Sequence, residues 1–494
     1  MKNHLIALCF LYGVVAKAQP PIKWQYCYGD TTADYAICME PISEGYIIAG
    51  YKSQCLKGME DFWVYKINHT GSLLWEKCLG GSQMDRAWAI QSAADGGYIV
   101  VGTTMSSDGD LINNKGGGGD FWVVKLGSLG NLQWQKTYGG SGLDIAYGVK
   151  QSRSGAYYVC GETSSTNGDV TNNKGSRDMW LIKLSSNGTL LWQKTYGGSG
   201  EEAAFAMDTT YDGGVVLAGQ ATTADGSGDV SQILGLRDYW VVKVDSSGTL
   251  QWERVYGTAG EEWVQSIRQT KDAGFVISGN IASNQFAIQQ NMCVLKISSS
   301  GVLQWQTNPG TTSVVDGRDI RQTKDLGYVL VGGGIDATAP GSSAKNYLIV
   351  KYSPTGTIQW KKFLGGTLTS FARAVVETND TGYVIAGITL ANDGDISGNH
   401  GKQDAWVVKV GYSTTGIDPI GSSTLVEVFP NPTSGIVNFS EMVDVRVYNY
   451  LGQLVLKSSK VKQVSLEEFP KGIYLFELTH KYSAQPYKVK ILKQ

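Results

Sequence analysis

The sequence predicts an all-β protein: a seven-bladed β-propeller over residues 19–410, followed by a small C-terminal β-sandwich over residues 424–494. Three observations carry the prediction. A unit of 51 to 60 residues recurs along most of the chain, each unit holds four strand-like runs, and the two ends of the array are complementary halves. The composition agrees, because 63 glycines beside only 11 prolines, with 11% aromatic residues, are typical of short strands joined by tight turns.

One tryptophan marks the register of the repeat. It recurs at Trp24, Trp75, Trp134, Trp192, Trp252, Trp305 and Trp360. In the unit 85–140 the strand-like runs are 85–92, 98–103, 121–126 and 132–138, and Asp-Gly-Gly between the first two is a strong hairpin-turn signal. Alternation along the last two runs fits strands and no helix. We expect the tryptophans to pack between neighbouring sheets.

The third run counts the blades. It occurs seven times, around Trp63, Trp122, Trp180, Trp240, Cys293, Leu348 and Trp406, each followed three residues later by a lysine. We expect these lysines to pair with the acid that opens the run, such as Asp120, or to cover apolar surface with their stems.

The two ends of the array fit each other. The array opens with a lone fourth run at 22–28 and ends with a unit, 371–410, that lacks one. The N-terminal strand is therefore predicted to close the last blade and leave no open sheet edge. An open β-solenoid or another blade count is the alternative.

The first 18 residues are predicted to be a signal peptide. Lys2 precedes an apolar run at 5–15 that is too short to span a bilayer, and Ala16-Lys17-Ala18 is a cleavage pattern. No later segment is long and apolar enough to cross a membrane, and a net charge of −2 gives no attraction to nucleic acid. Export permits disulfides, and four of the six remaining cysteines crowd into residues 27–78, as buried thiols or with one disulfide among them.

Four units carry a polar loop between the second and third runs. In each loop an acid after glycine stands nine or ten residues before the acid that opens the third run. Clustered carboxylates, amides and exposed carbonyls suit a hard cation, so calcium is one interpretation, without any EF-hand spacing. Solvated turns are the other, since Asp, Asn and Gly favour turns for backbone reasons. The candidate ligands are Asp108, Asp110, Asp120, Asn167, Asp169, Asp178, Asp229, Asp238, Asp393, Asp395 and Asp404.

Catalytic and cofactor motifs are absent from the sequence. The predicted mature chain holds only His69, His400 and His480, and none stands near a plausible nucleophile. No GxSxG, HExxH or phosphate-binding loop occurs, so we predict no catalytic residue and no cofactor other than possible calcium.

The repeat stops after Val410, and residues 411–423 are predicted to be a linker. The segment 424–494 resembles the type A C-terminal sorting domain of the type IX secretion system of Bacteroidetes. The resemblance implies export through the periplasm and across the outer membrane, with the secretion machinery as partner and the cell surface or medium as destination. It rests on Pro430, Asn431, Pro432, Gly435, Gly452, Gly472 and Tyr474, among other residues.

Three functions stay open for the repeat domain. The first is non-catalytic binding or adhesion to an extracellular glycan or protein through one face of the ring. The second is a secreted polysaccharide hydrolase or lyase whose carboxylates come from distant loops. The third is a purely structural surface-layer role. No residue pair in the sequence favours the catalytic alternative.

Overall fold

The computed structural model describes residues 19–55, 58–111, 114–282, 290–309, 316–336, 344–411, 428–429, 433–480 and 487–493. The predicted signal peptide lies outside these residues, and so does nearly all of the predicted linker. By its internal contacts the chain divides into two compact units, Met1–Tyr412 and Ser413–Gln494, and each is described by itself. Strands are the only regular elements in the described ranges, so no helix there is long and apolar enough to cross a membrane.

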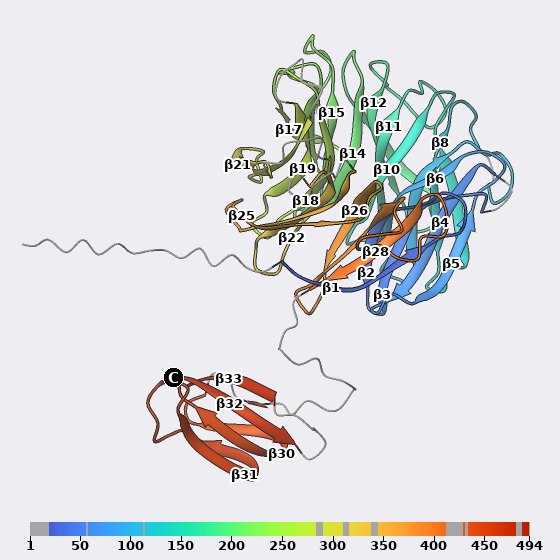
Figure 1. Ribbon diagram of the computed structural model, residues 1–494. Coiled ribbons are helices and arrows are strands. Elements are labelled where there is room, and N and C mark those ends of the chain that lie inside the picture. The colour runs from blue at the N-terminus through green and yellow to red at the C-terminus, as the bar shows by residue number, and fades with distance from the viewer. Residues whose placement is uncertain are drawn as a thin grey trace, which may run out of the picture. The chain divides into compact units, whose positions relative to one another are not determined.

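The described part of the first unit contains seven antiparallel four-stranded sheets (Figure 1). The first three contain β2 (Asp34–Ile42), β3 (Gly45–Ser53), β4 (Glu60–Asn68) and β5 (Leu73–Leu79); β6 (Asp85–Ser92), β7 (Tyr98–Thr104), β8 (Asp120–Leu126) and β9 (Leu132–Tyr138); and β10 (Asp144–Gln151), β11 (Tyr157–Thr163), β12 (Asp178–Leu184) and β13 (Leu190–Tyr196). The next three contain β14 (Glu202–Thr209), β15 (Val215–Ala221), β16 (Asp238–Val244) and β17 (Leu250–Tyr256); β18 (Glu262–Gln269), β19 (Phe275–Ala282), β20 (Gln290–Ile297) and β21 (Leu303–Thr307); and β22 (Asp316–Gln322), β23 (Tyr328–Gly334), β24 (Asn346–Tyr352) and β25 (Ile358–Leu364). The last contains β26 (Ser370–Glu377), β27 (Tyr383–Thr389), β28 (Asp404–Val410) and the N-terminal β1 (Ile22–Tyr28).

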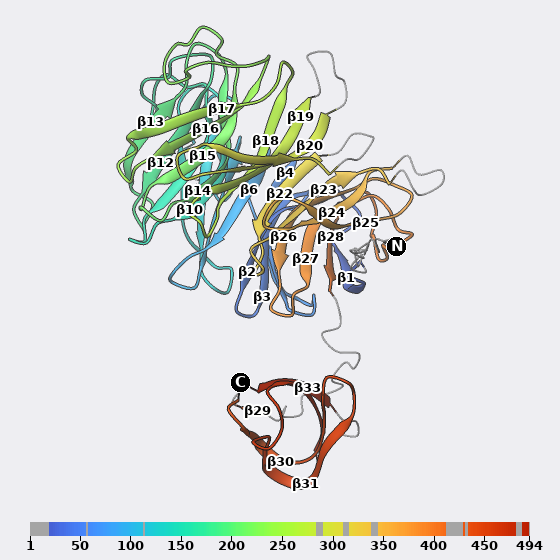
Figure 2. The same cartoon turned by 90° about the vertical axis from the view of Figure 1, so that its left-hand side faces the viewer.

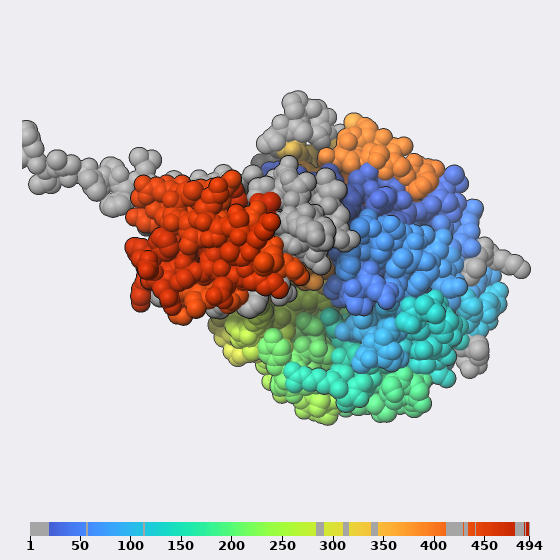
Figure 3. Space-filling model, turned by 90° about the horizontal axis from the view of Figure 1, so that it is seen from below, coloured from blue at the N-terminus to red at the C-terminus, as the bar shows by residue number. Residues whose placement is uncertain are grey.

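The first strands of the sheets form a closed circle. Each contacts the first strand of the next sheet, in the order β2, β6, β10, β14, β18, β22 and β26, and β26 returns to β2. In two views the orange strands β26 to β28 lie beside the blue β2 and β3 (Figures 1 and 2). The space-filling view likewise places the orange surface of the last sheet next to the dark blue surface of the first (Figure 3). The all-β, propeller-like architecture is therefore confirmed.

The last sheet is closed by the N-terminal strand, as the complementary ends predict. β1 pairs antiparallel with β28, with Cys27 opposite Trp406. Trp406 donates its indole N–H to Gln25 Oε1 at 2.9 Å, where Trp122 in the second sheet donates to Gln135 Oε1 at 3.1 Å. Strand β1 thus makes the contact that the fourth strand makes elsewhere, although 381 residues separate its glutamine from the tryptophan.

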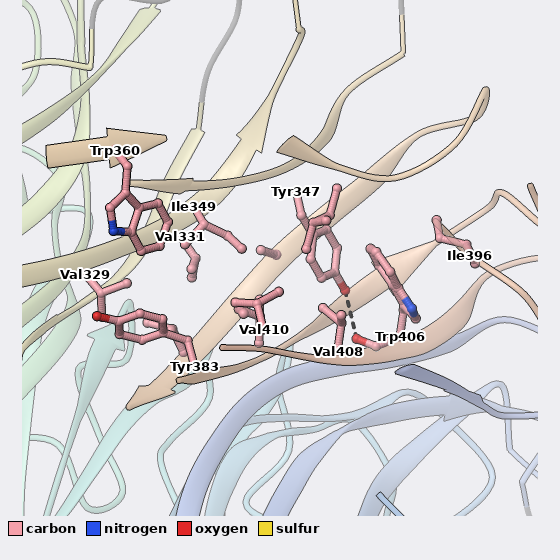
Figure 4. Packing of buried hydrophobic residues seen from close by; sticks show 14 of the residues in the cluster. Val329, Val331, Tyr347, Ile349, Trp360, Tyr383, Ile396, Trp406, Val408 and Val410 are labelled. Atoms are coloured by element: carbon pink, nitrogen blue, oxygen red, sulfur yellow. Dashed lines mark hydrogen bonds between the residues drawn. The ribbon is translucent and has the colours of Figure 1, made fainter. Parts of the chain in front are cut away.

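Core packing is concentrated between neighbouring sheets. The five tryptophans of the third strands are at most 1% exposed: Trp63, Trp122, Trp180, Trp240 and Trp406. Figure 4 illustrates the junction of the sixth and seventh sheets, where the Tyr347 hydroxyl donates to the carbonyl of Trp406 at 2.9 Å. The register-marking tryptophans are mostly half-buried, yet they also span the junctions: Trp134 packs against Tyr157, with ring centroids 6.3 Å apart, and against Gly188.

The expected pairing of the repeated lysines with the acid that opens the strand is wrong. Lys125 lies 2.8 Å from Asp95, in the turn between β6 and β7. Asp120 opens β8 and Lys125 is five residues further along, so the extended strand carries the two to opposite ends. Five other sheets repeat the pattern, in the pairs Lys66–Glu44, Lys243–Asp212, Lys296–Asp272, Lys351–Asp325 and Lys409–Asp380.

One disulfide forms among the four cysteines of residues 27–78. Cys55 and Cys78 are bonded, with Cα atoms 6.1 Å apart. The bond ties the connection after β3 to β5 within the first sheet. Cys27, Cys38, Cys160 and Cys293 are free thiols.

The second unit is a small β-domain with its own core. Its strands are β29 (Val428–Phe429), β30 (Ile436–Tyr448), β31 (Leu454–Ser465), β32 (Gly472–His480) and β33 (Tyr487–Lys493), joined in one hydrogen-bonded sheet in which the long β30 pairs with three others. Alternate residues of these strands, among them Val445, Val447, Phe476 and Leu478, form a separate apolar cluster. The predicted C-terminal β-domain is therefore confirmed as distinct from the repeat.

Candidate functional site

Each first strand carries a β-bulge at the same place. Two residues of β6, Ala87 and Ala89, face consecutive residues of β7, so Trp88 between them has no partner in the ladder. Gly102 on β7 allows this, because a Cβ there would stand 1.9 Å from the Arg86 carbonyl oxygen. The register shifts in the same way in all seven sheets, and the bulged residues are Ile37, Trp88, Tyr147, Phe205, Gln265, Arg318 and Arg373.

The bulged side chains line one cavity of about 460 Å³ at the centre of the circle of first strands. All seven contribute, together with Trp263, Asn280 and Asp316. A volume of this size lies within the range of small-molecule sites. Every lining side chain except that of Asn280 keeps part of its surface exposed, so solvent and a ligand reach the cavity.

One side of the cavity is aromatic. The Trp88 and Tyr147 rings lie 5.9 Å apart between centroids, and Phe205 meets Tyr147 edge-on at 5.0 Å. Trp263 continues the arc, with the Arg237 guanidinium stacked 4.3 Å from its ring. These contacts hold the rings in place while leaving them half-buried.

The other side is cationic. Arg318 donates from Nη1 to Gln265 Oε1 at 2.8 Å, and its Nη2 lies 3.9 Å from Asp316. The Asp316 carboxylate is already held by Asn280 at 2.9 Å and by Lys345 at 3.3 Å. Burial and the neighbouring Arg373 lower the pKa of Arg318 to about 10, which leaves it charged at neutral pH.

The guanidinium groups of Arg318 and Arg373 keep unused donors. The Nε atoms of both are buried without a hydrogen-bond partner among the described residues. Burial also lowers the pKa of Arg373. Among the described residues, Arg318, Arg373 and Lys345 thus bring three positive charges to a cavity that one carboxylate, that of Asp316, lines.

In a second cavity the other arginines have carboxylate partners. This cavity of about 140 Å³ shares the seven bulged residues and is lined also by Glu40 and Arg268. Arg321 lies 3.2 Å from both Glu40 and Asp319, and Arg268 lies 3.3 Å from Asp319. Burial alone would raise the pKa of Asp319, but the two arginines outweigh it and lower that pKa to about 2. The surplus positive charge therefore comes from Arg318 and Arg373, which line both cavities.

The sequence analysis missed this site. Its signal is periodic: in six of the seven sheets the lining residue stands three positions after the residue that opens the first strand, and in all seven it directly follows the residue that pairs with the glycine of the second strand. Because the seven residues differ in chemistry, no motif search finds them. Only the closure of the ring brings them together.

The predicted calcium-binding residues serve a different contact in the described chain. Asp110 accepts a hydrogen bond from Gly80 N at 3.1 Å, and Asp108 accepts one from Ser82 N at 2.7 Å. Both donors belong to the connection between the first and second sheets. Equivalent acceptors are Asn167 and Asp169 in the third sheet, Asp229 in the fourth, and Asp393 and Asp395 in the seventh.

The two acids of one loop do not meet. Asp169 binds Gly139 N, at the junction of the second and third sheets. Asp178 lies against Gly197, at the junction of the third and fourth, where a Cβ would stand 2.3 Å from its Oδ1. No group of three or more His, Cys, Asp or Glu side chains in the described ranges is placed to hold a metal ion. Calcium binding stays a prediction, with backbone N–H groups as competing partners of these oxygens.

The acids that open the third strands are buried against acids of the next sheet. Asp120, Asp178, Asp238 and Asp404 are fully buried, and each accepts a backbone N–H at one carboxylate oxygen. At Gly139 the free oxygen of Asp120 lies near Asp144, the first residue of β10. Burial raises the pKa of Asp120 to about 7, and the Asp144 carboxylate adds to the rise.

The described sorting-motif residues all shape the second unit. Gly452 takes a positive φ of 79° in the turn between β30 and β31, and Gly435 accepts a hydrogen bond from Leu466 N at 2.7 Å. Gly472 opens β32, and the Tyr474 hydroxyl donates to the Pro470 carbonyl at 2.6 Å. Pro430, Asn431 and Pro432 lie outside the described residues.

A family comparison decides the nature of this unit. Residues 427–493 match the family described as "Secretion system C-terminal sorting domain". The second unit is a type IX sorting domain. The sorting domain directs the chain to the type IX secretion machinery, and the protein is exported to the cell surface or the extracellular space. None of the curated proteins matches the chain.

Solved structures resemble the chain in fold alone. A polysaccharide lyase, Uly1, matches with a TM-score of 0.43 at 10% identity, over 80% of this chain and 94% of the other. Drosophila Plexin A, in complex with Semaphorin 1b, matches with a TM-score of 0.41 at 8% identity, over 80% and 87%. Sqt1 from Chaetomium thermophilum matches with a TM-score of 0.40 at 10% identity, over 78% and 100%. At these values the matches carry no argument about function.

Proposed function

We propose that the exported protein is a non-catalytic binding module whose ligand occupies the central cavity. The observation that carries the proposal is the convergence of seven bulged side chains, one from each sheet, on a single cavity of about 460 Å³. Bulges are over-represented next to functional sites because they re-aim a side chain out of the ladder. An apolar wall combined with a few convergent polar groups is the usual composition of a ligand site.

The chemistry of the lining favours binding over catalysis. A general acid or base needs a pKa near the working pH, and a nucleophile needs an adjacent base. Among the described residues the lining contains neither Ser, Cys nor His, and the one carboxylate there, that of Asp316, is held by Asn280 and Lys345. Arginine remains protonated and serves as a hydrogen-bond donor.

A polysaccharide hydrolase or lyase is the alternative. The cavity does hold one hydroxyl suited to proton transfer, that of Tyr147. Burial raises its pKa, and the hydroxyl lies 3.2 Å from Glu162 Oε1. Both effects oppose ionisation of the phenol, so they weigh against Tyr147 as a general base.

The test compares two aromatic truncations in the full mature protein. Trp88→Ala removes part of the cavity wall, whereas Tyr211→Ala removes a ring that is 53% exposed on a turn elsewhere. Retention on a panel of immobilised polysaccharides should fall at least tenfold in the Trp88 variant and stay unchanged in the Tyr211 variant.

The same panel separates binding from turnover. Release of reducing ends and formation of unsaturated sugars are measured in parallel, and both should stay at background. Retention that survives Trp88→Ala would place the binding site elsewhere. Turnover that Tyr147→Phe abolishes would establish the catalytic alternative.

A further inference from the structure

We infer that the central cavity binds the carboxylate-bearing sugar unit of an acidic polysaccharide, a uronate, with its carboxylate on Arg318 and Arg373 and its ring face on the aromatic arc. The inference rests on the proposed function and names the ligand class of that site. Three features of the cavity carry it: a charge surplus, unused donors, and the placement of the rings.

The net positive charge of the larger cavity favours an anionic ligand. Arg318 and Arg373 face the cavity together, and among the described residues only one carboxylate lines it, that of Asp316, which Lys345 at 3.3 Å and Arg318 at 3.9 Å share. In the adjoining smaller cavity the arginines have carboxylate partners, Arg321 with Glu40 and Arg268 with Asp319. With a neutral ligand the positive charges of Arg318, Arg373 and Lys345 would exceed the single negative charge of Asp316, so an anionic ligand is favoured.

The unused donors call for a planar acceptor. Arginine presents its N–H groups in a fork that matches a carboxylate in a bidentate way. The Nε atoms of Arg318 and Arg373 have no hydrogen-bond partner among the described residues, although both are buried. Because these Nε atoms are closed off from solvent, a ligand carboxylate would meet the outer N–H groups of the guanidinium forks and compensate their charge.

The aromatic side chains favour a ligand in which the anionic group is attached to a flat, partly apolar ring. The side chains of Trp88, Tyr147 and Phe205 follow one another, with ring centroids 5.9 and 5.0 Å apart. They come from the second, third and fourth sheets, whereas the two arginines come from the sixth and seventh. Their half-buried faces offer apolar surface to the C–H face of a pyranose. Gln265 lies between the two groups in strand order and supplies an amide for ring hydroxyls. A uronate carries an anion, a C–H face and hydroxyls in one unit.

The experiment measures affinity by titration calorimetry on the full mature protein with defined oligosaccharides. The carboxylate probes are oligogalacturonate, alginate oligomers and hyaluronan oligomers. Methyl-esterified oligogalacturonate is the neutral match, and dextran sulfate presents a different anion. At least one carboxylate probe should bind. Esterification of oligogalacturonate should weaken its binding at least tenfold, and dextran sulfate should bind at least tenfold more weakly than the tightest carboxylate probe, as expected for charge-assisted hydrogen bonds to a carboxylate.

Two variants tie the affinity to the arginines. Arg373→Gln should lower affinity for the acidic probe at least tenfold, and Arg153→Gln, at an exposed arginine outside the cavity, should leave it unchanged. Because Arg373 repels Arg318, its replacement should not lower the melting temperature, which separates lost binding from lost folding.

The outcomes distinguish this inference from the proposed function. If esterified or sulfated probes bind as tightly as carboxylate probes, or if Arg373→Gln retains full affinity while Trp88→Ala loses it, the uronate assignment falls and the binding module stands. If no carboxylate probe binds, the uronate assignment falls as well. If an acidic probe binds and neither Arg373→Gln nor Trp88→Ala weakens its binding, both the uronate assignment and the central binding site are refuted.

Discussion

Replacing Asp120 by asparagine should stabilise the protein at alkaline pH and flatten its dependence on pH. The side chain is fully buried, one carboxylate oxygen accepts from Lys115 N at 2.7 Å, and the other lies toward Asp144. Asparagine keeps the acceptor and puts a permanent N–H where the carboxyl needs a proton. The chain already contains this solution, since Asn346 opens the equivalent strand β24 in the sixth sheet.

The magnitude follows from the pKa of Asp120. Burial and Asp144 raise it from 3.8 to about 7, so the folded protein retains a proton that the unfolded chain releases above pH 4. Stability is therefore fully present below the unfolded pKa and falls as the pH rises toward 7. A difference of about three pKa units corresponds to about 4 kcal/mol between pH 4 and pH 8.

Urea denaturation of the mature protein at pH 5 and pH 8 measures the effect. Wild type should lose stability between the two conditions, and Asp120→Asn should lose less. The reciprocal variant Asn346→Asp should gain a smaller pH dependence of the same sign, because it places a carboxyl at the equivalent position, which is only partly buried. Equal pH slopes for wild type and Asp120→Asn, or a variant less stable than wild type at pH 8, would refute the reasoning.

Four further predictions concern the scaffold and the sorting domain. Trp180→Ala should cost about 3–5 kcal/mol, and Trp134→Ala less, because Trp180 is fully buried and Trp134 is half-buried; equal losses in denaturation would contradict this packing. Deleting residues 19–28 should strip Trp406 of its Gln25 partner and lower the melting temperature, and an unchanged melting curve would mean that β1 does not close the ring. Lys493→Met should destabilise the sorting domain by about 1–3 kcal/mol, because Nζ donates to the Leu466, Glu467 and Phe469 carbonyls, and should reduce the amount of protein in the medium. The calcium prediction is tested by calorimetric titration of wild type and Asp169→Asn; heat that the variant loses would confirm it, and no heat would remove it.

The sequence predicted the parts of the fold that rest on local rules. Turn residues, strand alternation and the count of repeats located the sheets, and the orphan run at 22–28 correctly pointed to closure with β28. Contacts between sheets were harder to predict. Lys125 pairs with Asp95 instead of Asp120, because strand length separates residues that are close in the chain. Asp169 and Asp178 stand nine residues apart, yet each belongs to a different junction.

The seven first strands differ from one another at the bulged position. The residue directly before the bulge is small in most sheets, as in Ala36, Ala87 and Ala146, which are fully buried between sheets. One position further the residue varies from Ile37 through Trp88 to Arg373, although the backbone bulges there in every sheet. Packing constrains the first position, and the central cavity faces the second. A ring of equivalent bulges can thus hold different side chains without disturbing the scaffold, and the ligand site that we propose lies where the repeats of this chain differ from one another.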